Sequence, residues 1–266
     1  MKIEIYKPGS EEQKRGNFML FYGKSGAGKS ATPLQTAEDP IFWLLAERGQ
    51  VDLTIKAINR PKLKLVVGYY EGWDDLLDTI YNTSIFLDAK IKTLLFDGLT
   101  HAMNIHLADE IMAEDYDARD TSKDKGKDLT MRTKMSQEGY GALSKQMTRL
   151  MKGFENLTKV GIDVICTARD QENPKWDRNL ACAPALAGKE FPRDFKGFFD
   201  FIGLVESRVD ENDVVIYPPL VSCDDNGSYL SKWSGCKPKS GVIRKPFDVN
   251  QMMSVAHGTY TNGKEE

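Results

Sequence analysis

One eight-residue pattern, directly after an apolar run, constrains the fold of this chain more than any other feature. The run at residues 18–22 (FMLFY) has the length and aromatic content of a buried β-strand, and GKSGAGKS follows at residues 23–30. The spacing G-x-x-x-x-G-K-[ST] is that of the Walker A loop, whose glycines let the backbone wrap around a phosphate and turn its N–H groups inward. We therefore expect a strand, this loop and a helix at residues 31–37 in one α/β unit.

The same pattern assigns the nucleotide contacts. Lys29 is expected to reach the β- and γ-phosphates, and Ser30 is expected to place its hydroxyl on Mg²⁺. ATP and Mg²⁺ are therefore the expected ligands. The predicted nucleotide-binding residues are Gly23, Lys24, Ser25, Gly26, Ala27, Gly28, Lys29, Ser30 and Ala31.

The composition excludes some classes of protein. Hydrophobic residues make up 41% of the 266 residues, charged residues make up 28%, and the net charge is −3. This acidity argues against a protein that coats nucleic acid with its whole surface, but it allows a local basic groove. No apolar stretch reaches the roughly 18 residues that span a bilayer, so we expect no membrane association and a cytoplasmic location. The four cysteines form no C-x-x-C pair, so we expect no metal beyond the magnesium of the nucleotide.

Two acids at predicted strand ends are candidates for the metal and the attacking water. Residues 41–45 (IFWLL) form a second apolar strand, and Glu47 follows it at the edge where open α/β sheets bind ligands. Residues 91–96 form another apolar strand that ends in Asp97, the Walker B pattern, in which the aspartate supports the magnesium shell. The alternatives are a helix cap for Asp97 and, for Glu47, an ordinary surface acid paired with Arg48 or Lys56.

Periodicity predicts further elements of both kinds. Further helices are expected at residues 73–87 and 136–157. Further strands are expected at residues 62–67, 161–167, 201–209 and 213–221. Two long segments without a regular period, residues 115–134 and 170–189, are interpreted as surface loops with a functional role.

Both loops contain candidate contacts with DNA. Lys125, Lys127, Lys175 and Arg178 could bind phosphates, and Trp176 offers a ring on which a base could stack. The alternative interpretation of the first loop, residues 115–134, is a solvent-exposed loop that binds no ligand.

The order of these elements resembles the RecA-like recombinase core. Walker A is followed by a strand that leads to Glu47, by a Walker B aspartate with Gly98-Leu99-Thr100 after it, and by a helix and strand that end in Thr167-Ala168-Arg169. The resemblance covers residues 17–246 and is strongest to short phage-encoded RecA-like ATP-binding proteins, some of which act in single-strand annealing and recombination. It implies an α/β domain over residues 1–250, with a mostly parallel central sheet flanked by helices and an antiparallel C-terminal extension. Residues 251–266 are expected to form a tail that frays.

The resemblance also implies roles for individual residues in a Mg²⁺-dependent ATPase. Glu47 takes the place of the base that polarises the attacking water. Arg169 stands where recombinases carry an amide that senses the γ-phosphate, so it either touches that phosphate or pairs with Asp170 or Glu172. Related proteins have residues that reach the ATP of a neighbouring subunit. The resemblance places Lys232, Lys237 and Lys239 at these positions. The three lysines could equally form a solvent-exposed edge.

The implied partners are single-stranded DNA, further copies of the chain in a ring or filament, and a single-strand-binding protein. Helicase-loader and packaging-type motor ATPases are one alternative, but they typically carry a glutamate directly after the Walker B aspartate, where this chain has Gly98. A P-loop small-molecule kinase is a second alternative, with basic residues 123–134 as its lid. A nucleotide-bound interaction protein with negligible turnover is a third.

Overall fold

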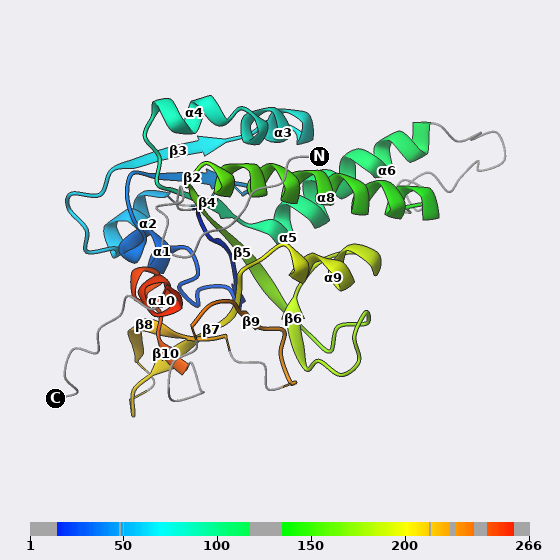
Figure 1. Ribbon diagram of the computed structural model, residues 1–266. Helices are drawn as coiled ribbons and strands as arrows, with labels where there is room; N and C mark the ends of the chain where they lie inside the picture. The colour runs from blue at the N-terminus through cyan, green and yellow to red at the C-terminus, as the bar shows by residue number, and fades with distance from the viewer. Residues whose placement is uncertain are drawn as a thin grey trace.

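A mostly parallel β-sheet runs through the molecule and carries helices on both faces (Figure 1). The computed structural model describes residues 15–47, 49, 51–117, 135–212, 214–223, 227–236 and 244–257. The strands are β1 (Phe18–Gly23), β2 (Ile41–Leu45), β3 (Leu65–Tyr69), β4 (Thr93–Asp97), β5 (Asp163–Glu172), β6 (Cys182–Pro184), β7 (Phe201–Val209), β8 (Val215–Ser222), β9 (Lys232–Trp233) and β10 (Arg244–Pro246). The helices are α1 (Ala31–Thr36), α2 (Val51–Ala57), α3 (Trp73–Tyr81), α4 (Thr83–Asp88), α5 (Leu99–His101), the π-helix η1 (Ala102–Leu107), α6 (Ala108–Asp117), α8 (Gln137–Lys159), α9 (Glu190–Asp194), the 3₁₀-helix η3 (Phe195–Gly197) and α10 (Val249–Ala256).

The sheet has the order β10-β8-β7-β1-β5-β4-β2-β3. The strands from β7 to β3 run parallel to one another, whereas β8 pairs antiparallel with β7 and β10 pairs antiparallel with β8. Two short strands lie off this path, because β9 pairs with β7 and β6 pairs with β5. This architecture confirms the predicted α/β class, a mostly parallel central sheet flanked by helices with an antiparallel C-terminal extension.

The central strands are apolar throughout because both faces of the sheet are covered. In β1, Phe18, Leu20 and Tyr22 pack into one core with α3, α6 and α8. The alternate residues Met19 and Phe21 pack into a second core with α1 and α10 on the opposite face. A run of five apolar residues without polar alternation is what a strand between two helical layers requires.

The parallel register aligns the carboxyl ends of four strands. Gly23 of β1 lies opposite Arg169 of β5, Asp97 of β4 lies opposite Thr167 of β5, and Leu45 of β2 lies opposite Asp97. Because parallel strands end at the same edge, the loops that leave them converge there. The phosphate-binding loop and both candidate acids are therefore brought to one side of the sheet.

Most of the predicted elements are present, with shifts that have local causes. The strand predicted at 62–67 begins at Leu65, because a turn closed by the bond from Leu63 N to Arg60 O occupies the preceding residues. The helix predicted at 73–87 is divided at Asn82, whose ψ of 76° leaves the helical region. The helix predicted at 136–157 is α8, and Ser136 caps it by accepting a hydrogen bond from Gly139 N at 2.8 Å.

Two parts of the chain differ from the sequence analysis. The helical segment from Leu99 to Asp117 was not predicted from the sequence. It contains the π-helix η1, whose wider turn shifts the apolar residues before it relative to those after it, so the whole segment does not follow one 3.6-residue period. Residues 170–189 are not an irregular loop throughout, since β5 continues to Glu172 and pairs with β6, with Asp170 opposite Pro184. Residues 118–134 of the other predicted loop lie outside the described residues.

The C-terminal boundary also lies further along the chain than residue 250. Helix α10 runs to Ala256, and its residues Val249, Met252 and Met253 are buried in the core on the α1 face. Residues 251–256 therefore pack with the domain. In the part of the chain that the structure describes, no helix combines the length and the hydropathy needed to cross a bilayer.

The aromatic core beneath β1 provides a test of the packing. Phe154 of α8 is fully buried, with ring centroids 5.8 Å from Phe18 and 5.3 Å from Phe96. Phe154→Ala should lower the free energy of unfolding by about 3–5 kcal/mol, because it leaves a cavity between α8 and the sheet. Urea denaturation measures this loss. Leu87→Ala, at a position 48% exposed, is the control, and its effect should stay within about 0.5 kcal/mol; equal losses would contradict the packing described here.

Candidate functional site

The loop between β1 and α1 has the backbone of a phosphate cradle. Gly26 and Gly28 have φ values of +77° and +89°, a left-handed conformation that side chains with a Cβ rarely adopt. A Cβ on Gly28 would also lie 3.1 Å from Cγ of Pro219 in β8. The backbone therefore requires glycine at Gly28, one of the two glycines of the predicted spacing, and also at Gly26, which the spacing leaves open.

Lys29 lies across this loop rather than pointing into solvent. Its Nζ donates hydrogen bonds to the carbonyl oxygens of Gly23 at 2.9 Å and Lys24 at 2.6 Å. Burial lowers the pKa of Lys29, although the nearby carboxylates of Asp97 and Asp170 act in the opposite direction. The ammonium group is thus held at the mouth of the loop by acceptors that a phosphate oxygen can replace.

Asp97 is oriented by groups on two neighbouring strands. Thr167 of β5 donates its hydroxyl hydrogen to Asp97 Oδ1 at 2.5 Å, and the indole Nε1 of Trp43 in β2 donates to Oδ2 at 3.3 Å. The carboxylate is accordingly held by side chains and does not cap a helix. The sequence analysis did not assign Trp43 or Thr167 to the site. The signal that could have found them is the parallel register, which places Thr167 opposite Asp97.

Glu47 and Arg169 form an ion pair with each other. The distance from Arg169 NH2 to Glu47 Oε2 is 3.1 Å, and His101 Nδ1 lies 3.6 Å from the same oxygen. More than half of each side chain of the Glu47–Arg169 pair is exposed, 56% for Glu47 and 59% for Arg169. The backbone N–H of Arg169 also donates to Thr100 Oγ1 at 3.0 Å. The alternative partners considered for Arg169, Asp170 and Glu172, are not the ones that it pairs with.

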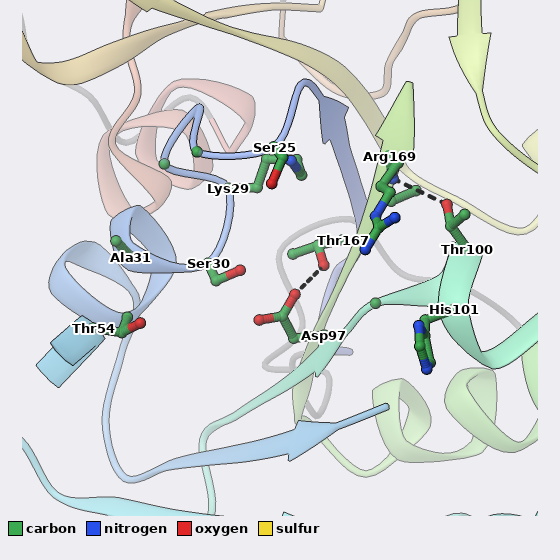
Figure 2. A pocket seen from close by; sticks show the side chains of 14 residues that line it. Ser25, Lys29, Ser30, Ala31, Thr54, Asp97, Thr100, His101, Thr167 and Arg169 are labelled. Carbon is green, nitrogen blue, oxygen red and sulfur yellow. Dashed lines mark hydrogen bonds between the residues drawn. The ribbon is translucent and has the colours of Figure 1, made fainter. Parts of the chain in front are cut away.

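These residues surround one cavity of about 310 Å³, which Figure 2 shows from close by. Lys29 and Ser30 come from the loop, Asp97 from the end of β4, and Thr167 and Arg169 from β5. An adjoining hollow of about 150 Å³ is lined by Ser30, Asp97 and Glu47. Thr54 of α2 lines both spaces, a contribution that the sequence analysis missed.

The residues present fit magnesium and a nucleotide. Ser30 occupies the N-cap position of α1, yet its hydroxyl makes no capping hydrogen bond and faces the cavity that Asp97 lines. A hydroxyl and a carboxylate are the oxygen donors that Mg²⁺ takes from P-loop proteins. Lys29 and the glycine backbone complete the surface for phosphate groups.

The residues predicted to contact DNA or a neighbouring subunit are dispersed. Lys175 and Arg178 are exposed, whereas Trp176 is partly buried, packs against the core and has its Nε1 buried. Lys232 belongs to β9 and donates to the Lys196 carbonyl at 3.2 Å. Lys125, Lys127, Lys237 and Lys239 lie outside the described residues.

A comparison with protein families agrees with this geometry. A family model described as an AAA domain (AAA_24) matches residues 15–240. The chain belongs to this family. Membership of a family of AAA domains confirms the P-loop ATPase part of the prediction, whereas the link to phage recombination stays a prediction.

Other comparisons were made with curated proteins and solved structures. None of the curated proteins is similar enough to this chain to count as a match. Among solved structures, the flagellar accessory protein FlaH from Methanocaldococcus jannaschii is 10% identical, over 87% of this chain and 90% of that chain, with a TM-score of 0.43.

The hydrogen bond from Thr167 to Asp97 can be tested through magnesium. Thr167→Val removes the hydroxyl that orients the carboxylate, so Mg²⁺-dependent nucleotide binding should weaken about 10–100-fold, the usual effect of losing an outer-shell partner. Titration of a fluorescent ATP analogue with Mg²⁺ and with EDTA measures this, and binding in EDTA should not change. Thr148→Val, which removes a hydroxyl on the outer side of α8, serves as the matched control. If the two variants respond alike to Mg²⁺, Thr167 does not orient a metal ligand.

Proposed function

We propose that this protein is a Mg²⁺-dependent ATPase that acts on single-stranded DNA in phage-type recombination or single-strand annealing. The observation that carries the ATPase activity is the convergence of Lys29, Ser30 and Asp97 on one cavity, with Glu47 on the adjoining hollow. Action on DNA rests on the resemblance of the element order to the RecA-like recombinase core. The proposal includes assembly with further copies of the chain and work in the cytoplasm.

The chain's own residues have separate tasks in ATP hydrolysis. MgATP supplies the phosphoanhydride bond that is cleaved and the cation that neutralises its charge. Lys29 exchanges the Gly23 and Lys24 carbonyls for phosphate oxygens. The Ser30 hydroxyl and the Asp97 carboxylate would hold the cation, and Thr167 and Trp43 keep that carboxylate from rotating. Because these side chains are in place before ATP binds, less reorganisation is needed to reach the transition state.

The pair of Glu47 and Arg169 couples the base to the phosphate. In the pair, Arg169 draws the Glu47 carboxylate toward itself through Oε2, so the pair sets the direction in which the carboxylate faces a water. When Arg169 turns toward the γ-phosphate, it stabilises negative charge there and releases Glu47. The half-exposed guanidinium lines the main cavity and has room for this change. Glu47 thereby becomes available as a base in the nucleotide-bound state.

Gly98 disfavours the motor-type alternative. Loader and packaging ATPases place a glutamate at the position after the Walker B aspartate, and here a Cβ on Gly98 would lie 3.4 Å from the Thr167 hydroxyl that binds Asp97. The base must come from another strand, and Glu47 after β2 has that position.

Two substitutions separate binding from chemistry. Lys29→Ala should abolish binding of an ATP analogue because it removes the charge at the loop. Glu47→Gln should leave binding within a factor of about two and slow phosphate release about 10²–10⁴-fold, the usual contribution of general base catalysis. Equilibrium titration and a phosphate-release assay measure the two effects. Normal turnover of Glu47→Gln would remove the catalytic assignment of Glu47.

Arg169 has its own expected signature. Arg169→Ala should lower kcat about 10²–10³-fold, as the loss of one transition-state donor does, although Glu47 is then unpaired. Arg169→Lys, the conservative variant, should recover part of the rate. A faster turnover in Arg169→Ala would mean that the arginine only restrains Glu47.

Phosphate release with and without single-stranded DNA tests the DNA part of the proposal. Stimulation of turnover by DNA is expected. Transfer of the γ-phosphate to a nucleotide or a sugar, without DNA stimulation, would instead favour the kinase alternative.

A further inference from the structure

A second large groove lies on α8, away from the ATP cleft. It has a volume of about 800 Å³ and is lined by the middle of α8 and by Glu190 at the start of α9. Leu143, Met147 and Leu150 of α8 point into the core, so the groove lies on the opposite, outer side of the helix. Neither the family match nor the ATPase chemistry uses this surface.

The groove is basic, although the whole chain has a net charge of −3. Lys145, Arg149 and Lys152 line it, and Glu190 is the one acid among its lining residues. Their spacing of four and three residues puts the cations on one helix face over about 10 Å, because an α-helix rises 1.5 Å per residue. The salt bridges among the described residues include none of these three side chains.

The remaining lining groups suit a phosphate backbone as well. Gly141, Ala142 and Ser144 are small and line the groove in the turn of α8 before Lys145. Ser144 and Gln146 have polar groups of the kind that contact phosphate and sugar. Tyr81 of α3, which is 44% exposed, does not line the groove but contacts the same helix, because its hydroxyl donates to the Arg149 carbonyl at 2.8 Å. An aromatic ring beside a basic track provides a face for stacking that does not depend on base sequence.

We infer that the α8 groove binds the phosphodiester backbone of single-stranded DNA, with Lys145, Arg149 and Lys152 contacting successive phosphates. This inference rests on the proposed action on DNA and locates it on a helix rather than on the loops predicted from sequence. A recessed track with a row of cations fits one flexible strand. A duplex is instead read by an element that enters its groove.

Salt-dependent binding tests the groove. The full chain is titrated with a labelled oligothymidylate of about 16 nucleotides, the upper end of single-strand site sizes, by fluorescence anisotropy. The titrations are run at about 50 mM and about 200 mM salt, a range over which phosphate contacts weaken measurably. The triple variant Lys145→Ala, Arg149→Ala, Lys152→Ala should bind at least about tenfold more weakly at the lower salt. Its slope of log K against log salt should be shallower by about two, since each single-strand contact contributes about 0.7.

A matched control removes the same charge elsewhere. Lys62, Lys64 and Lys92 are exposed residues before β3 and β4, at the opposite end of the strands from the ATP cleft. Their triple alanine variant should bind DNA as the parent protein does. Both triple variants should bind the fluorescent ATP analogue normally and should keep the circular dichroism and melting temperature of the parent.

The other outcomes overturn the inference in distinguishable ways. Unchanged affinity and slope in the α8 variant would exclude the groove, and an equal loss in the control would mean that only overall charge matters. Tighter binding to a duplex of the same length would overturn the assignment to a single strand. No binding by the parent protein would remove both the groove and the proposed action on DNA, whereas ATP turnover measured without DNA decides the ATPase proposal separately.

Discussion

The site depends on the hydrogen bonds that hold the Asp97 carboxylate between β2 and β5. Trp43 and Thr167 reach its two oxygens from opposite sides, and they can do so only because β2, β4 and β5 are adjacent and parallel. A one-residue slip of either neighbouring strand would turn the partner side chain to the other face of the sheet. The register that builds the two cores therefore also fixes the carboxylate that is proposed to bind the metal.

The groups for binding and the groups for chemistry differ in how firmly they are held. The glycine backbone and Asp97 are fixed by conformation and by partly buried hydrogen bonds. Glu47 and Arg169 are more than half exposed and hold one another across the edge of the cleft. Exposed ion pairs contribute little to stability, so this pair can exchange partners at low cost when a phosphate arrives. Such a division suits an enzyme that binds in a preformed cradle and activates its base afterwards.

The two faces of α8 link the core to the proposed DNA groove. One side of the helix packs Phe154 against β1 and β4, and the other side presents Lys145, Arg149 and Lys152. After α8 the chain enters β5, the strand that carries Thr167 and Arg169. A shift of α8 on binding DNA would therefore displace residues of the ATP cleft through packed side chains rather than through a flexible connection.

The sequence by itself determined the phosphate loop, the strands β1, β2 and β4, and the amphipathic helix α8, because each depends on residues close together in the chain. Spacing also predicted roles for Lys29, Ser30 and Asp97, and the structure brings these three residues to one cavity. Trp43, Thr167 and the Glu47–Arg169 pair were decided only by the tertiary structure, because they involve residues 54 to 122 positions apart that meet through strand order. The partial burial of Trp176 was also decided by the tertiary structure, since its packing against the core depends on the pairing of β5 with β6 and cannot be read from an irregular segment.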